Sequence, residues 1–110
     1  MSANGMYVDI KEFQTAKGGY RSYVIVRHDD LQYPICLYRI SEEEYSAVLM
    51  RCTHQGAELQ VAGDQLTCPA HGSSFTKWGK VVAAPAATDL RRFDVSVKEN
   101  QLFIDLRKQA

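Results

Sequence analysis

Apolar and polar residues alternate most clearly near the end of the chain, over residues 93–97 and again over residues 102–106. A period of two places every second side chain on the same face of a β-strand. Glu99 and Asn100 lie between the two segments and are typical turn residues. This pattern predicts an antiparallel hairpin with one buried and one polar face.

Further strands are predicted wherever short runs rich in Val, Ile and Tyr lie between Gly, Pro or Asp residues. They are residues 6–13, 20–27, 35–40, 45–50, 57–62 and 65–68. Ser41–Glu44 resembles the start of a helix, so a helix over 45–50 is the alternative, but these residues show no sustained helical period. Residues 76–78 form only a short segment before Gly79, and residues 81–88 are predicted to be a loop around Pro85. Many short strands separated by turns indicate an all-β antiparallel sandwich or barrel.

The composition fits one domain covering residues 1–110, and no internal repeat or linker divides it. The formal net charge is zero, so the basic surface that nucleic-acid binding requires is not expected. No window has the length of apolar sequence that a transmembrane helix needs, and the N-terminus lacks the pattern of a secretory signal. We expect a cytoplasmic protein if the chain is complete. If a signal was trimmed, a periplasmic or lipid-anchored, membrane-associated protein is expected instead.

Candidate chemistry is concentrated in two short segments, Cys52-x-His54 and Cys68-x-x-His71, each followed closely by a glycine. Both spacings are too tight for a pair on one helix face, so each predicts a loop that folds around a metal. Three cysteines cannot all be paired, and Cys36 has no neighbouring histidine. Because Cys36 lies in an apolar strand, we expect it to be a buried structural residue.

Two thiolates and two imidazoles are also the ligands of many zinc sites, but those usually begin with a Cys pair and end with a His pair. A disulfide, or a Cys–His nucleophile pair, would leave the duplicated pattern unexplained. In iron–sulfur proteins, two histidines can replace two cysteines on one iron. Four thiolates leave an oxidised [2Fe–2S] cluster doubly negative, whereas two thiolates and two neutral imidazoles leave it neutral. Such centres therefore accept an electron more easily, at about −150 to +300 mV against about −400 mV for plant-type ferredoxins.

The segments CTHQG and CPAHGSSF, followed by GKVVAAPA and LRRF, resemble the Rieske iron–sulfur family. This resemblance implies one [2Fe–2S] cluster with Cys52 and Cys68 on one iron and His54 and His71 on the other. It also implies a small cluster-binding subdomain over about residues 51–85. Ser73 matches the serine that donates a hydrogen bond to a bridging sulfide in the family.

The chain departs from the quinol-oxidising members of the family in several positions. Ala57 and Ala70 stand where those members have a disulfide, so this bridge cannot form here. Phe75 replaces a tyrosine whose hydroxyl bonds a ligand sulfur, and Gln55 replaces a shielding leucine. With Ser73 kept and the tyrosine hydroxyl lost, we expect an intermediate reduction potential.

These observations predict a one-electron carrier that serves a protein redox partner and has no catalytic residues or substrate site of its own. A ferredoxin that delivers electrons to an oxygenase and an exported respiratory protein are the two alternatives within this class. A non-redox, zinc-stabilised module is a further alternative. A complete Rieske oxygenase would need a second iron held by two further histidines and a carboxylate. Only His28 remains after the two loops, so this chain does not supply that site.

Overall fold

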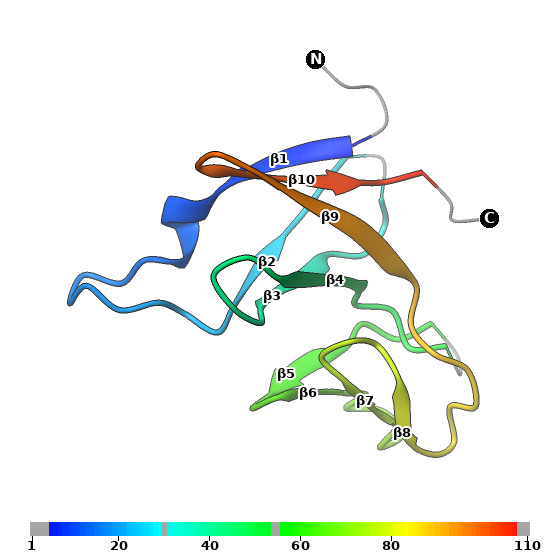
Figure 1. The fold of residues 1–110 in the computed structure, drawn as a ribbon. Coiled ribbons are helices and arrows are strands. Elements are labelled where there is room, and N and C mark those ends of the chain that lie inside the picture. The colour runs from blue at the N-terminus through cyan, green and yellow to red at the C-terminus, as the bar shows by residue number, and fades with distance from the viewer. Residues whose placement is uncertain (1–4, 30, 54–55, 108–110) are drawn as a thin grey trace.

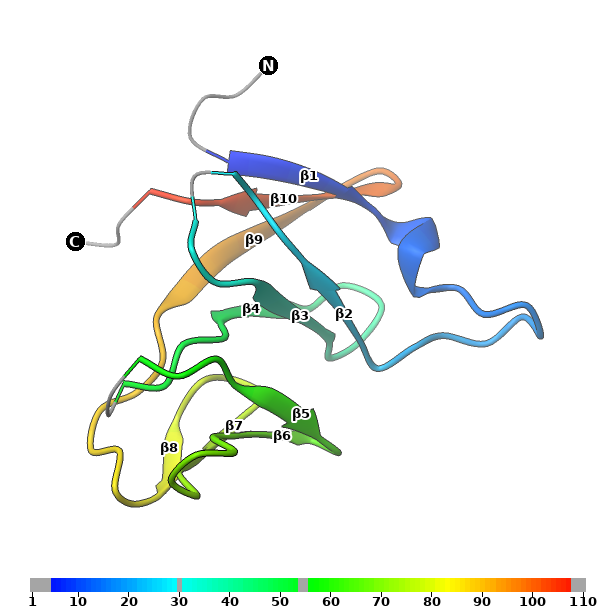
Figure 2. The same ribbon diagram turned by 180° about the vertical axis from the view of Figure 1, so that it is seen from behind.

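The computed structural model describes residues 5–29, 31–53 and 56–107, which form two antiparallel sheets. In spatial order, the six-stranded sheet contains β1 (Gly5–Asp9), β10 (Gln101–Asp105), β9 (Arg92–Lys98), β4 (Tyr45–Leu49), β3 (Ile35–Arg39) and β2 (Tyr23–Val26). The four-stranded sheet contains β5 (Gln60–Ala62), β6 (Gln65–Thr67), β7 (Ser74–Thr76) and β8 (Val81–Ala83). Figures 1 and 2 show the small sheet beside β3 and β4 of the large sheet. The predicted all-β, antiparallel architecture is confirmed.

Strand β3 is buried on both faces and separates two hydrophobic clusters. Cys36 and Tyr38 belong to the cluster shared with the small sheet, which we call the inter-sheet cluster. Ile35 and Leu37 belong to the other cluster, together with apolar residues of β1, β9 and β10. Because alternate side chains leave a strand on opposite faces, a strand between two apolar layers needs a continuous apolar run. The segment ICLY meets this requirement.

The hairpin between β7 and β8 attaches the small sheet to the large one. The Ser46 hydroxyl of β4 donates to the Lys77 carbonyl at 2.8 Å. Gly79 has φ +86°, and a side chain there would begin 3.1 Å from Val48 and 3.2 Å from Leu90. A glycine is therefore needed both for the backbone conformation and for the close approach of the hairpin to β4.

The turns predicted before residue 45 and at residues 99–100 are confirmed. The Ser41 hydroxyl accepts the backbone N–H groups of Glu43 and Glu44, which closes a polar turn, and β4 begins directly afterwards. The helical alternative for residues 45–50 is therefore wrong. At the other end of the chain, β9 and β10 pair with Val95 opposite Ile104, as the alternation predicts.

Besides the strand predicted over 57–62, which is shortened to β5, three of the predicted segments differ from the structure. The strand over residues 6–13 ends at Asp9, whose side chain accepts the Lys11 N–H and caps a 3-10 helix (η1) over Ile10–Phe13. This turn buries Phe13, whose ring lies 5.3 Å from that of Tyr45. The strand over 20–27 is shortened to β2, because residues 20 and 21 pair back with the chain around Phe13 and Gln14.

The third difference concerns the second half of the small sheet. The loop predicted over 81–88 begins with strand β8, which pairs with β7 across the Gly79 hairpin. Val81 and Val82 are good strand residues, but their pairing depends on a partner strand of only three residues. In the part of the chain that is described, no helix is long and apolar enough to cross a membrane.

Because β3 lies between two clusters, substitutions in β3 should lower the free energy of unfolding more than substitutions in the edge strand β2. Leu37→Ala should lower the free energy of unfolding by about 2–5 kcal/mol, because Leu37 is fully buried and the cavity cannot refill. Ile25→Ala on the edge strand β2 is the control, since Ile25 is 48% exposed and should cost less than about 1 kcal/mol. Urea unfolding measures both, and equal losses would contradict the two-faced burial of β3.

Candidate metal centre

The two cysteine-containing loops, residues 52–57 (loop 1) and 68–73 (loop 2), are closed by the same pair of backbone hydrogen bonds. In loop 1, the Cys52 N–H donates to the Ala57 carbonyl and the Gly56 N–H donates to the Cys52 carbonyl, both at 2.8 Å. In loop 2, the Cys68 N–H donates to the Ser73 carbonyl at 2.8 Å and the Gly72 N–H to the Cys68 carbonyl at 2.9 Å. The two loops therefore share one backbone design.

The glycine of each loop stands four residues after its cysteine and has a left-handed backbone. Gly56 has φ +77° and Gly72 has φ +83°. This region is strained for residues with a side chain, so glycine at this position lets the chain reverse within five residues. The glycine that closely follows each predicted metal-binding segment is therefore the residue at which its loop turns back.

The predicted ligand residues differ in their exposure. Cys52 and Cys68 are buried and belong to the inter-sheet cluster, together with Leu66 and Phe75. His71 is exposed, and its Nδ1 lies 4.0 Å from the Cys68 Sγ. His54 lies outside the described residues. Across the described residues, no three Cys, His, Asp or Glu side chains form a group that could hold a metal ion.

A third segment, residues 84–88 (the proline loop), connects the two cysteine loops. Ser73 of loop 2 is fully buried, and its hydroxyl oxygen accepts the Ala86 N–H at 3.0 Å. The Thr53 hydroxyl of loop 1 donates to the Thr88 carbonyl at 2.7 Å. Since Ala86 is itself buried in the inter-sheet cluster, the proline loop is held against both cysteine loops.

Two contacts of loop 1 were not predicted from the sequence. One is the Thr53–Thr88 hydrogen bond, and the other is the hydrogen bond that the Tyr33 hydroxyl donates to the Gly56 carbonyl at 2.5 Å. The residues in these pairs are 35 and 23 positions apart. No local pattern in the sequence indicates either pairing.

The donor types fit an iron–sulfur cluster with mixed ligands. Two buried cysteines can supply the thiolates, and an exposed imidazole lies close to one of them. In clusters of this kind, hydrogen bonds from backbone N–H groups to sulfur stabilise negative charge and tune the potential.

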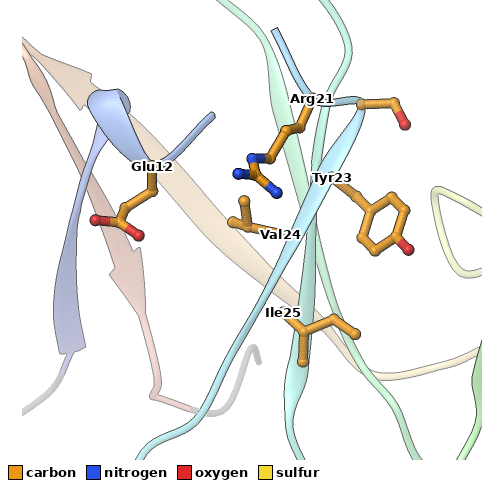
Figure 3. A pocket seen from close by; sticks show the side chains of 6 residues that line it. Glu12, Arg21, Tyr23, Val24 and Ile25 are labelled. Atoms are coloured by element: carbon orange, nitrogen blue, oxygen red, sulfur yellow. The ribbon is translucent and has the colours of Figure 1, made fainter. Parts of the chain in front are cut away.

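A pocket of about 610 Å³ lies on a different part of the surface, between η1 and the free edge of β2. Figure 3 shows Glu12 on the η1 side of this pocket and Arg21 on the β2 side, with Val24 next to Arg21. The lining residues are Glu12 and residues 21–25, and they include none of the predicted ligands.

The third cysteine, Cys36, is buried in β3 as predicted. Burial raises the pKa of its thiol to about 12, and the nearby Tyr38 hydroxyl lowers this pKa only in part. The Tyr38 hydroxyl has no well-aligned hydrogen-bond partner among the described residues, so its contact with the thiol is weak. A thiol with such a high pKa is a poor nucleophile and a poor metal ligand.

Comparison with known proteins places the chain in a family. A sequence model of the Rieske [2Fe–2S] domain matches residues 6–94. The chain belongs to this family, and it is a one-electron carrier with a single [2Fe–2S] cluster.

Two curated relatives represent different branches of the family. The ferredoxin CarAc of Metapseudomonas resinovorans is 33% identical over 75 residues, which cover 64% of this chain and 69% of the relative. The cytochrome b6-f complex iron-sulfur subunit of Chlorobaculum tepidum is 29% identical over 63 residues, covering 56% of this chain and 35% of that subunit. The match therefore spans about a third of the length of the longer relative.

A solved structure shows the same arrangement of strands. The plasma membrane Rieske protein of Synechocystis PCC 6803 superposes with a TM-score of 0.67 at 25% identity, covering 77% of this chain and 87% of that one. The expected Rieske-like fold is confirmed.

The raised pKa of Cys36 predicts an alkaline loss of stability. In the unfolded chain the thiol ionises near its ordinary pKa of 9.0, whereas the buried thiol keeps its proton up to about pH 12. Between these values the folded state binds more protons, so the free energy of unfolding falls as the pH rises, by at most about 1.4 kcal/mol per unit. Urea unfolding between pH 8 and pH 11 measures this slope.

The control is Cys36→Ala, which should be less stable at neutral pH but should lose less stability between pH 9 and pH 11. Equal slopes for the two proteins would contradict the burial of an un-ionised thiol.

Proposed function

We propose that Cys52, Cys68, His54 and His71 hold the [2Fe–2S] cluster, and that Ser73 tunes its potential. The observation that carries this proposal is the shared design of loops 1 and 2, each with a buried cysteine and the same backbone closure. Two equivalent loops that face one apolar cluster can each supply one thiolate and one imidazole.

The exposure of the candidate donors supports a particular route for electron transfer. When bound, the cluster takes up and releases one electron at a time. His71 is exposed while both cysteines are buried, so the imidazole edge is the part of the site that a partner can reach. Electron transfer then takes place through the histidine side, between two protein surfaces and without a substrate pocket.

Residues 51–85 form the proposed cluster-binding subdomain. They include both cysteine loops and all four strands of the small sheet, with bounds from Gln60 to Ala83. The β7–β8 hairpin, with its Ser46–Lys77 hydrogen bond, attaches this subdomain to β4. The large sheet thus serves as a base for the site.

Similarity to the ferredoxin CarAc supports one particular role. In that role, this chain is a ferredoxin that delivers electrons to an oxygenase. Similarity to the cytochrome b6-f subunit supports a second candidate, a subunit of a membrane-bound oxidoreductase. In either role the partner is another redox protein.

Substitution of His71 tests the ligand assignment. His71→Ala should abolish the Rieske-type EPR signal of the dithionite-reduced protein, because one iron loses a nitrogen ligand. The matched control is His28→Ala, which removes the histidine of the β2–β3 connection and should leave the signal unchanged. A Rieske signal in His71→Ala would refute the assignment.

Substitution of Ser73 tests the tuning of the potential. Its hydroxyl oxygen accepts the Ala86 N–H, so the hydroxyl hydrogen remains for donation to a cluster sulfur. A hydrogen bond to a charged group is worth about 1.5–3 kcal/mol. Ser73→Ala should therefore lower the midpoint potential, by up to roughly 60–120 mV for a one-electron couple.

The control for this experiment is Ser74→Ala, because Ser74 is adjacent but belongs to strand β7. Protein-film voltammetry measures both variants. Equal potentials for Ser73→Ala and the unsubstituted protein would remove Ser73 from the site.

A further inference from the structure

Tyr33 and Arg51 contact loop 1 from outside, at its left-handed glycine. We propose that these two side chains are positioning residues, which hold loop 1 at Gly56 against the large sheet and set the local charge. This inference rests on the proposed ligand role of loop 1. Neither residue belongs to the family motifs identified in the sequence.

Tyr33 links the backbone of the large sheet to loop 1. It lies in the connection between β2 and β3, directly before Pro34. Pro34 is fully buried, and its carbonyl accepts the Met50 N–H at 2.9 Å. The phenol of Tyr33 therefore extends from an anchored backbone to the Gly56 carbonyl.

Arg51 lies close to both Tyr33 and Gly56. Its guanidinium carbon lies 5.8 Å from the centre of the Tyr33 ring, within the range of a cation–π interaction. Two guanidinium nitrogens and the Tyr33 hydroxyl lie 3.4–3.5 Å from the point where a side chain on Gly56 would begin. Tyr33, Arg51 and Gly56 thus form one group of mutual contacts, which we call the loop 1 clamp.

The base of loop 1 is held by the same part of the large sheet. Arg51 pairs with Glu58 in an isolated β-bridge, and the Leu59 N–H donates to the Met50 carbonyl at 3.0 Å. Arg27, at the end of β2, lies 3.7 Å from the Glu58 carboxylate. Loop 1 is therefore a short hairpin whose two ends and whose glycine all contact the β2–β3 side of the molecule.

Loop 2 differs from loop 1 at the equivalent glycine. Although the two loops have the same backbone closure, Gly72 has no such contact among the described residues: apart from its own chain neighbours, none of their atoms lies within 4 Å of the point where a side chain would begin. The backbone design alone therefore does not require a clamp. The additional contacts on loop 1 are a separate feature of this chain.

The two clamp residues should have distinct effects on the site. A ligand must be held firmly by its supporting contacts if its geometry is to stay the same in both redox states. The Tyr33 hydrogen bond provides such support. The positive charge of Arg51 favours the more negative, reduced state, and because Arg51 is exposed, salt should weaken this effect.

The experiment compares Tyr33→Phe with Tyr7→Phe in the cluster-loaded protein. Tyr33→Phe removes the hydrogen bond but keeps the ring over which Arg51 lies, whereas Tyr7 is an exposed residue of β1. We expect Tyr33→Phe to broaden the EPR lines of the reduced protein and to speed cluster loss to a chelator about twofold to tenfold, the factor that one hydrogen bond supports. Tyr7→Phe should change neither.

The second arm compares Arg51→Gln with Arg21→Gln. Arg21 is also exposed, but it lies before the start of β2, whereas Arg27, which contacts the base of loop 1, follows the end of β2. Arg51→Gln should lower the midpoint potential at low salt, with a smaller difference at high salt, and Arg21→Gln should have a smaller effect.

Two outcomes of the Tyr33 experiment would overturn the clamp: EPR lines and cluster loss equal to those of Tyr7→Phe, or a lower urea midpoint with no change in either. Two outcomes of the Arg51 experiment would also overturn it: a midpoint potential that Arg51→Gln leaves unchanged, or a change in that potential that does not depend on salt. The absence of a Rieske-type EPR signal in the unsubstituted protein would instead refute the proposed ligand set. The two failures are therefore distinguishable.

Discussion

The closure of the two cysteine loops by their own backbones is the constraint on which the rest of the site depends. Each cysteine uses its N–H and its carbonyl inside its own loop, so its backbone polar groups are satisfied. The cysteine side chains can then be buried in an apolar cluster without leaving unpaired polar groups beside them. The arrangement therefore combines two buried cysteines with the accessible imidazole of His71.

The large sheet contributes rigidity rather than chemistry. Its strand β3 is buried on both faces, and the two clusters on either side share this one strand. The small sheet is attached to it by the β7–β8 hairpin and by the common inter-sheet cluster, and Tyr33 attaches loop 1. A site that exchanges electrons without moving substrate benefits from such fixed attachment, since little of the structure has to rearrange.

The strands and the site were predictable to different extents. Strands β3, β4, β9 and β10 were predicted because their alternation or apolar runs are long enough to be distinctive. The 3-10 helix at Ile10–Phe13 and strands β7 and β8 were missed, since the helix is decided by the burial of Phe13 and the two strands by their pairing with each other. Short elements carry too little local signal to outweigh such tertiary contacts.

The sequence by itself determined the cofactor class, because the types and spacing of the candidate ligands are local properties of residues 52–54 and 68–71. It also showed a glycine shortly after each candidate histidine, and the structure showed that both glycines have a left-handed backbone. Only the tertiary structure decided what holds the loops in place: Thr53 bonds to Thr88, Ser73 to Ala86, and Tyr33 to Gly56. These contacts join segments that are distant in the chain, and their existence depends on how the two sheets pack together.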